Sequence, residues 1–197
     1  MMRPRLAIDL DNTIACYDDL FVRLASERSI DLAGVAPRKT AVQRRLCETG
    51  RESLWTELQG EAYGPRMVDA APFPGVADFL ARCREGAVEV FIVSHRSRAP
   101  YSGRGHDLHQ AARSWLEARG WIEPERIFLE PTIADKVSRI CALGCTHLID
   151  DLVSVLQNRA LPETLVRILF DPHREAGQSR HFTVIESWPQ ADRLLGL

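Results

Sequence analysis

Lysine is scarce in this sequence, in which only Lys39 and Lys136 stand beside 23 arginines. A chain that takes its generic positive charge from arginine is expected to keep a lysine where a compact ammonium has a specific purpose. An excess of charge is lacking as well, because the formal net charge is −2. This balance gives no reason to expect a nucleic-acid-binding surface.

Long apolar runs are also missing. No run approaches the length that crosses a membrane. The opening Met-Met-Arg-Pro-Arg is followed by only three apolar residues before Asp9, which is too few for a signal peptide. The five cysteines are scattered, and no pair of cysteines or histidines completes a zinc pattern. We therefore expect a cytoplasmic protein with reduced cysteines and with no membrane or nucleic-acid partner.

Short apolar segments alternate with helical patterns over most of the chain. Alternating strands and helices of this kind predict an α/β fold with a Rossmann-like parallel sheet that helices cover on both faces. The expected strands cover residues 6–9, 88–93, 126–129, 146–149 and 165–170.

Residues 17–71 interrupt the alternation. They contain three helical patterns and no convincing strand, and Gly50 separates the second helix from the third. The sequence therefore predicts a small helical insertion after the first strand, with residues 1–16 and 72–197 forming the core. Six basic residues of the insertion either lie on solvated helix faces or reach an anionic substrate: Arg38, Lys39, Arg44, Arg45, Arg51 and Arg66.

Reactive side chains follow the ends of the predicted strands. Because the carboxyl ends of parallel strands meet at one edge of a sheet, we expect these side chains to share a crevice. Repulsion among several carboxylates favours a divalent cation with oxygen ligands, above all Mg²⁺. With Mg²⁺ and one ammonium the charge is roughly balanced, and the site then suits phosphoryl transfer. The side chains concerned are Asp9, Asp11, Ser94, Lys136, Asp150 and Asp151.

Four ordered motifs carry a resemblance to a known family. The segment Asp9-Leu10-Asp11-Asn12-Thr13, then Ser94, Lys136 and Asp150-Asp151, resembles the motifs of the haloacid dehalogenase (HAD) superfamily. The helical insertion resembles the cap that this superfamily carries in its first insertion position. The resemblance implies an HAD-type core and a phosphatase that works through a covalent aspartyl phosphate.

The resemblance also implies catalytic roles. Asp9 is the expected nucleophile, and Asp11 is the expected acid that protonates the leaving oxygen and then activates water. Ser94 is expected to donate a hydrogen bond to a phosphoryl oxygen. Lys136 is expected to offset charge on Asp9 and on the phosphate.

The implied metal is Mg²⁺. Its expected ligands are Asp9, the backbone carbonyl of Asp11, and one or both of Asp150 and Asp151. The superfamily often has another acid four residues after the last motif, but Val155 stands there in this chain. The division of labour between the two neighbouring aspartates is therefore left open.

Four further residues are candidates for binding substrate. Asn12 and Thr13 either contact the substrate or only stabilise the turn after the first strand. His95 and Arg96 follow Ser94 and either touch the substrate or have a structural role.

The leading interpretation is a Mg²⁺-dependent phosphatase for a small phosphorylated metabolite, either a sugar phosphate or a nucleoside monophosphate. Asp11 favours a phosphatase over a dehalogenase, because a halide leaving group needs no proton. A 5'-(deoxy)nucleotidase of the same superfamily is an alternative, although no aromatic pair for stacking a base is evident. Another alternative is a non-catalytic phosphate-binding protein or a receiver domain, but the order of the acids and the lysine argues against a receiver.

Overall fold

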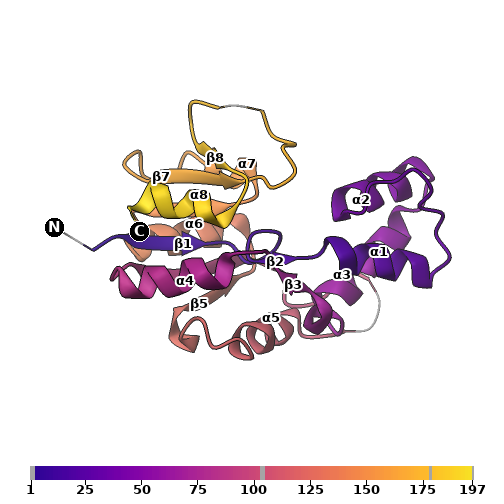
Figure 1. The fold of residues 1–197 in the computed structure, drawn as a ribbon. Helices are drawn as coiled ribbons and strands as arrows, with labels where there is room; N and C mark the ends of the chain where they lie inside the picture. Colours follow the sequence, from indigo (N-terminus) through magenta and orange to yellow (C-terminus); the bar gives the residue numbers. More distant parts are fainter. Residues whose placement is uncertain (1–2, 103–104, 178, 197) are drawn as a thin grey trace.

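The computed structural model of the chain describes residues 3–102, 105–177 and 179–196. Its centre is a six-stranded sheet in the order β5-β4-β1-β6-β7-β8, in which all neighbouring strands run parallel (Figure 1). The predicted α/β fold with a Rossmann-like sheet is therefore confirmed, whereas β8 is a strand that the sequence pattern did not predict. The strands are β1 (Arg5–Ile8), β4 (Glu89–His95), β5 (Ile127–Glu130), β6 (His147–Asp150), β7 (Val166–Phe170) and β8 (Thr183–Ile185).

Strand β1 lies inside the sheet because its apolar residues are buried on both faces. Leu6, Ala7 and Ile8 are fully buried. Leu6 and Ile8 belong to one hydrophobic cluster, and Ala7 belongs to a second cluster on the opposite face. Burial on both sides explains why this strand is a continuous apolar run rather than an alternating one.

Helices cover both faces of the sheet (Figure 1). On the face of Leu6, Phe79 of α4 packs against Trp188 of α8 with ring centroids 4.8 Å apart. On the face of Ala7, Ile140 of α6 is fully buried. The core helices are α4 (Val76–Glu85), α5 (Leu108–Glu117), η2 (Pro124–Arg126), α6 (Ile133–Ala142), α7 (Val153–Leu156) and α8 (Trp188–Leu195).

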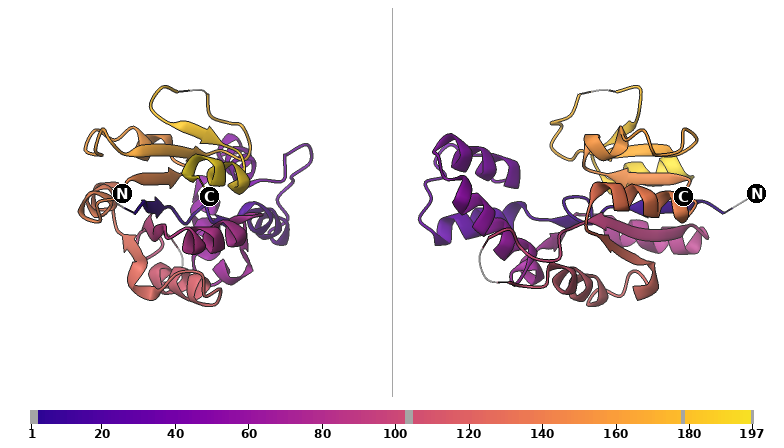
Figure 2. Two further views of the ribbon diagram at one scale, coloured as in Figure 1. Left: turned by 60° about the vertical axis from the view of Figure 1, so that its left-hand side comes forward. Right: turned by 180° about the vertical axis from the view of Figure 1, so that it is seen from behind.

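The helical insertion lies beyond the carboxyl end of β1 (Figure 2). The chain leaves and returns through two short antiparallel strands, in which Ala15 pairs with Pro72. The insertion has an apolar centre of its own, where the rings of Phe21 and Trp55 stack with centroids 4.7 Å apart. Its elements are β2 (Ala15–Cys16), α1 (Asp18–Glu27), α2 (Lys39–Glu48), α3 (Glu52–Tyr63), η1 (Met67–Asp69) and β3 (Ala71–Pro72).

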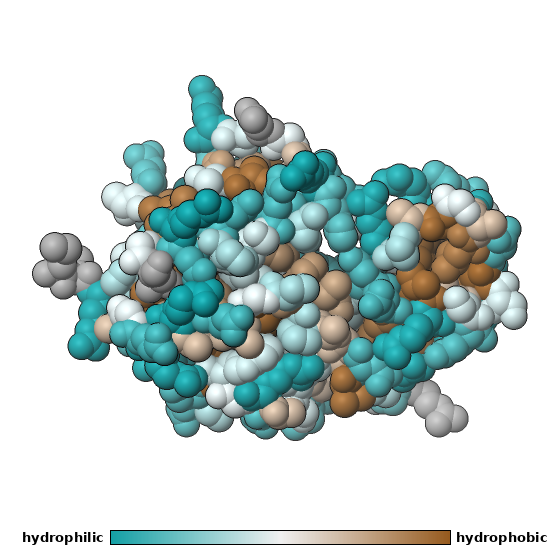
Figure 3. Space-filling model, viewed as in Figure 1, coloured by the Kyte–Doolittle hydropathy of each residue, from teal (hydrophilic) through white to brown (hydrophobic). Residues whose placement is uncertain are grey.

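The surface is mostly hydrophilic on the face shown in Figure 3, with hydrophobic residues gathered over part of the insertion. A search of the described residues finds no helix that is both long enough and apolar enough to cross a membrane.

Candidate active site

Asp9 lies directly after β1, where the backbone of the neighbouring strand fixes it. Its amide N–H donates to the carbonyl oxygen of Ile149 at 2.9 Å. The residue is only 5% exposed. Its Oδ1 accepts a hydrogen bond from Lys136 Nζ at 2.5 Å. The sheet therefore brings the first acid of the Asp-x-Asp segment into direct contact with a lysine 127 residues away.

Lys136 joins two acids. Its Nζ also lies 2.6 Å from Oδ2 of Asp150, and the lysine is 1% exposed. Helix α6 carries Lys136 in its first turns. Thr132 caps the start of this helix, and its hydroxyl oxygen accepts from the amide of Asp135 at 3.1 Å. The predicted lysine thus reaches the ends of both β1 and β6.

The charges of this group perturb one another. Burial raises the pKa of Asp9 to about 6; repulsion from Asp150 and Asp11 adds to the rise, and Lys136 opposes it. Burial opposes the charge of Lys136, but the carboxylates of Asp150 and Asp9 outweigh it and raise the pKa of the ammonium. Negative charge is therefore in excess around Asp9.

Asp11 lies directly before a tight turn and has its own cation. Asn12 holds φ at 59°, a left-handed conformation that asparagine tolerates well. The Oδ1 of Asp11 accepts from the hydroxyl of Tyr17 at 2.7 Å and from Arg96 Nη2, while Oδ2 accepts from Arg96 Nε at 3.1 Å. Burial favours the neutral acid, but Arg96 and Tyr17 outweigh it and lower the pKa of Asp11.

Arg96 fastens the core to the helical insertion. It is 4% exposed, and its Nη2 donates to the hydroxyl oxygen of Tyr17 at 2.9 Å. Its Nη1 donates to the backbone oxygens of Tyr63 at 3.2 Å and Leu108 at 3.1 Å. Arg96, a predicted substrate-binding residue, therefore lies in the site, and all three of its guanidinium nitrogens are hydrogen-bonded to protein groups.

The two neighbouring aspartates differ in their surroundings. Asp150 is fully buried, and its Oδ1 accepts from the amide of Leu152 at 2.9 Å. Asp151 is half-buried and faces the cavity described below. Burial raises the pKa of Asp151 well above its usual range, and repulsion from Asp9 and Asp150 adds to the shift.

Ser94 and Thr13 lie buried behind these charges. Neither hydroxyl has a hydrogen-bond partner among the residues that the structure describes. Buried hydroxyls are usually bonded, so both are available to an added acceptor. Neither lines the cavity, in contrast to Asn12 and His95, which do.

A cavity of about 310 Å³ opens between the core and the insertion, where Figure 3 shows the surface hollowed. The core contributes most of the predicted residues to its wall, among them Asp9, Asp11 and Lys136. The insertion contributes Lys39 and one face of α3. The lining residues that the sequence analysis missed include Thr56, Gln59, Tyr63 and Tyr101.

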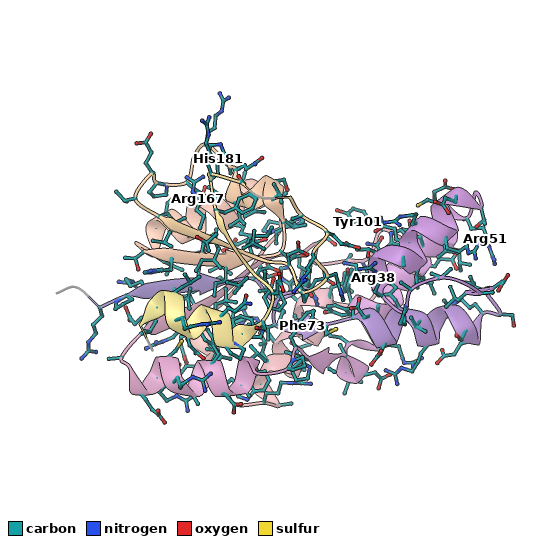
Figure 4. All side chains as sticks on the ribbon, turned by 45° about the horizontal axis from the view of Figure 1, so that its top comes forward. Arg38, Arg51, Phe73, Tyr101, Arg167 and His181 are labelled. Atoms are coloured by element: carbon teal, nitrogen blue, oxygen red, sulfur yellow. The ribbon has the colours of Figure 1, made fainter. Side chains whose placement is uncertain are left out.

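A sequence signal for part of this wall exists. Thr56, Gln59 and Tyr63 recur at the i, i+3, i+7 spacing of one helix face. A polar face on a helix over a crevice is a candidate substrate wall, but the same pattern also suits a solvated face. Figure 4 shows Tyr101 and Arg38 where the core and the insertion face each other.

The residues present fit a magnesium ion. Within the described ranges no three His, Cys, Asp or Glu side chains form a ready metal cluster. Mg²⁺ needs only one or two carboxylates, however, because it keeps several waters. Asp9 and Asp151 both line the cavity, where their carboxylates would be ligands for a divalent cation.

No family model matches this chain, and neither does any curated protein. Solved structures do match. A phosphoserine phosphohydrolase-like protein from Francisella tularensis is 14% identical, with 98% of this chain and 99% of that chain covered and a TM-score of 0.56. The HAD-hydrolase YfnB from Bacillus subtilis, bound to magnesium, is 13% identical over 100% of both chains, with a TM-score of 0.56.

A dehalogenase shares the architecture. L-2-haloacid dehalogenase from Xanthobacter autotrophicus, with chloropropionic acid covalently bound, is 13% identical over 99% of both chains, with a TM-score of 0.55. Together these structures show that the chain has the fold of the HAD-superfamily hydrolases. The fold that the four motifs imply is therefore confirmed.

Proposed function

We propose that this protein is a Mg²⁺-dependent HAD phosphatase that hydrolyses a small phosphorylated metabolite through an aspartyl phosphate. The observation that carries the proposal is the pairing of Lys136 with Asp9 and Asp150 at the wall of a cavity that Asp11 also lines. A nucleophile, a balancing ammonium and a second carboxylate then surround one small ligand. A volume of about 310 Å³ suits such a ligand.

In the first half-reaction the carboxylate of Asp9 attacks phosphorus. A bond forms between the Asp9 oxygen and phosphorus as the bond to the ester oxygen breaks. Lys136 holds the nucleophile in place and offsets charge on the phosphoryl oxygens. Ser94 remains the predicted donor to one of those oxygens, because its buried hydroxyl has no partner among the described residues, although the side chain lies behind the cavity wall in this structure.

Asp11 moves the protons. It protonates the departing oxygen and then takes a proton from the water that cleaves the aspartyl phosphate, which frees Asp9 and inorganic phosphate. Arg96 and Tyr17 hold Asp11 as a carboxylate, which suits the second step. The first step needs the protonated form, which Asp11 regains when it takes the proton from water in the second step of the preceding turnover.

Three residues would hold the proposed magnesium ion: Asp9, Asp11 through its backbone carbonyl, and Asp151. When bound, the ion would supply positive charge to the phosphoryl group. Asp150 holds Lys136 instead, because its Oδ2 faces the ammonium inside the protein.

The shared fold leaves a dehalogenase as the second chemistry to exclude, since one of the similar structures is a dehalogenase. The carboxylate of Asp11 at the cavity favours the phosphatase, because a halide leaves without a proton. The test measures phosphate release from para-nitrophenyl phosphate and chloride release from 2-chloropropionate with one preparation. We expect phosphate release that requires Mg²⁺ and stops with EDTA. Chloride release without phosphate release would overturn the proposal.

A further inference from the structure

Lys39 brings the second of the chain's two lysines to the same cavity as Lys136. It is the first residue of α2 and comes from the insertion, opposite the aspartates of the core. Its amide N–H donates to Oδ1 of Asp18 at 2.8 Å, which fixes the start of the helix. A chain that otherwise uses arginine therefore places both of its compact ammonium groups around one small volume.

The two lysines differ in their partners. Lys136 pairs with Asp9 and Asp150, whereas Lys39 has no carboxylate within 4.0 Å among the residues that the structure describes. Its Nζ lies 5.5 Å from the ring centroid of Tyr63, a weaker cation–π contact. Lys39 is thus a half-buried ammonium at a cavity wall. Burial opposes its charge, but Tyr63 and the more distant Asp151 and Asp11 outweigh burial and raise its pKa, so the ammonium stays charged.

The residues on either side of Lys39 both bind a carboxylate of the core. Arg38 pairs with Glu175 at 3.2 Å, and the hydroxyl of Thr40 donates to the same carboxylate at 3.2 Å. These contacts fasten the start of α2 to the core loop after β7. The position of Lys39 relative to the core is therefore fixed, while its own charge is left for the cavity.

The part of the cavity wall that α3 contributes includes polar side chains. Gln59 and Thr56 line the cavity beside Lys39. A ligand whose phosphoryl group meets Asp9 and Lys136 on the core side extends toward this wall. The charge that such a wall complements is negative.

We propose that Lys39 binds a second anionic group of the substrate, a carboxylate or a second phosphate. The proposal rests on the proposed phosphatase function and narrows its substrate class to phosphomonoesters that carry another negative charge. Lys39 acts as a specificity-determining residue, and it takes no part in the bond-making at Asp9.

The test compares substrate pairs that differ in the second anion. The carboxylate pair is 3-phosphoglycerate against glycerol 3-phosphate, and the phosphate pair is glucose 1,6-bisphosphate against glucose 6-phosphate. We measure kcat and KM with Mg²⁺ for the wild type, Lys39→Gln and Lys39→Arg. The control variant is Arg44→Gln, which removes one charge from an exposed position of the same helix.

We expect the wild type to prefer the doubly charged member of at least one pair. Lys39→Gln should lower kcat/KM for that member by roughly 10- to 100-fold, as the loss of a hydrogen bond to a charged group does. Its kcat/KM for the singly charged member and for para-nitrophenyl phosphate should fall by much less, which separates the loss of an anion contact from a general loss of activity. Lys39→Arg should restore part of the preference, and Arg44→Gln should leave it unchanged.

Several outcomes would overturn the inference while the phosphatase stands. They are an equal loss on both members of each pair, no preference in the wild type, and the same loss in Arg44→Gln. The carboxylate and phosphate pairs distinguish the two sources of the anion. A wild type that hydrolyses none of the esters, including para-nitrophenyl phosphate, would remove the proposed function and this inference together.

Discussion

Arg96 donates hydrogen bonds to both carboxylate oxygens of Asp11, although the two residues are 85 positions apart. Because the guanidinium also binds the backbone of Tyr63 and the hydroxyl of Tyr17, it links the candidate acid–base group to the helical insertion. A movement of the insertion would therefore change the hydrogen bonds that Arg96 donates to Asp11.

The first prediction concerns the stability that this pair provides. Arg96→Met should lower the free energy of unfolding by on the order of 3 kcal/mol, because it leaves a largely buried carboxylate without its cation. The control is Arg98→Met, which breaks an exposed pair with Asp107 and should cost about 1 kcal/mol or less. Urea unfolding measures both. Adding Asp11→Asn to Arg96→Met should recover part of the loss; strict additivity would show that the pair is not coupled.

The second prediction separates Asp9 from Asp11. Asp9→Asn should lose at least about 100-fold in kcat while the protein stays folded, because burial and nearby carboxylates already disfavour a charge at this position. Asp11→Asn should still form the aspartyl phosphate from an ester with a good leaving group and show a burst of product. Rapid-mixing kinetics measure the burst. Its equal absence in both variants would count against the acid–base role of Asp11.

The third prediction concerns Lys136. The ammonium lies between Asp9 Oδ1 at 2.5 Å and Asp150 Oδ2 at 2.6 Å, and the lysine is buried. Lys136→Arg conserves the charge but should lose roughly 100-fold in kcat, since an error of about 1 Å in the position of the phosphate costs that much. Overpacking should also cost about 1–3 kcal/mol of stability.

Arg139→Lys is the matched control on the same helix, because Arg139 pairs with Glu130 nearer the surface. It should be close to neutral for both the rate and the unfolding midpoint. Wild-type turnover in Lys136→Arg would remove the lysine from the site.

The fourth prediction divides the two neighbouring aspartates. Asp151→Asn should raise the Mg²⁺ concentration that gives half-maximal activity by about tenfold, because a cavity-facing carboxylate is lost. Asp150→Asn should mainly lower stability, since Lys136 then keeps one buried partner instead of two. Mg²⁺ titrations of activity and urea unfolding give the two readouts. A reversed result would make Asp150 the metal ligand.

The local pattern of the chain determines much of the fold. The apolar run before Asp9 is sufficient to predict β1, because burial on both faces leaves no polar alternation. The helical spacing of apolar residues in 17–71 predicts the helices of the insertion, because each of these helices buries one face. Strand β8, with three residues, is too short to show a period, and its pairing with β7 decides it.

The candidate site likewise depends partly on the sequence pattern and partly on the tertiary structure. The ends of β1 and β6 place Asp9, Asp11 and Asp151 at one edge of the sheet, and the start of α6 brings Lys136 there. This follows from the sequence because parallel strands end together. The ion pair between Arg96 and Asp11 and the position of Lys39 at the cavity wall depend on how the insertion packs against the core. Contacts between segments far apart in sequence leave no local periodicity, so only the tertiary structure decides which of the cavity-lining cations pair with a carboxylate.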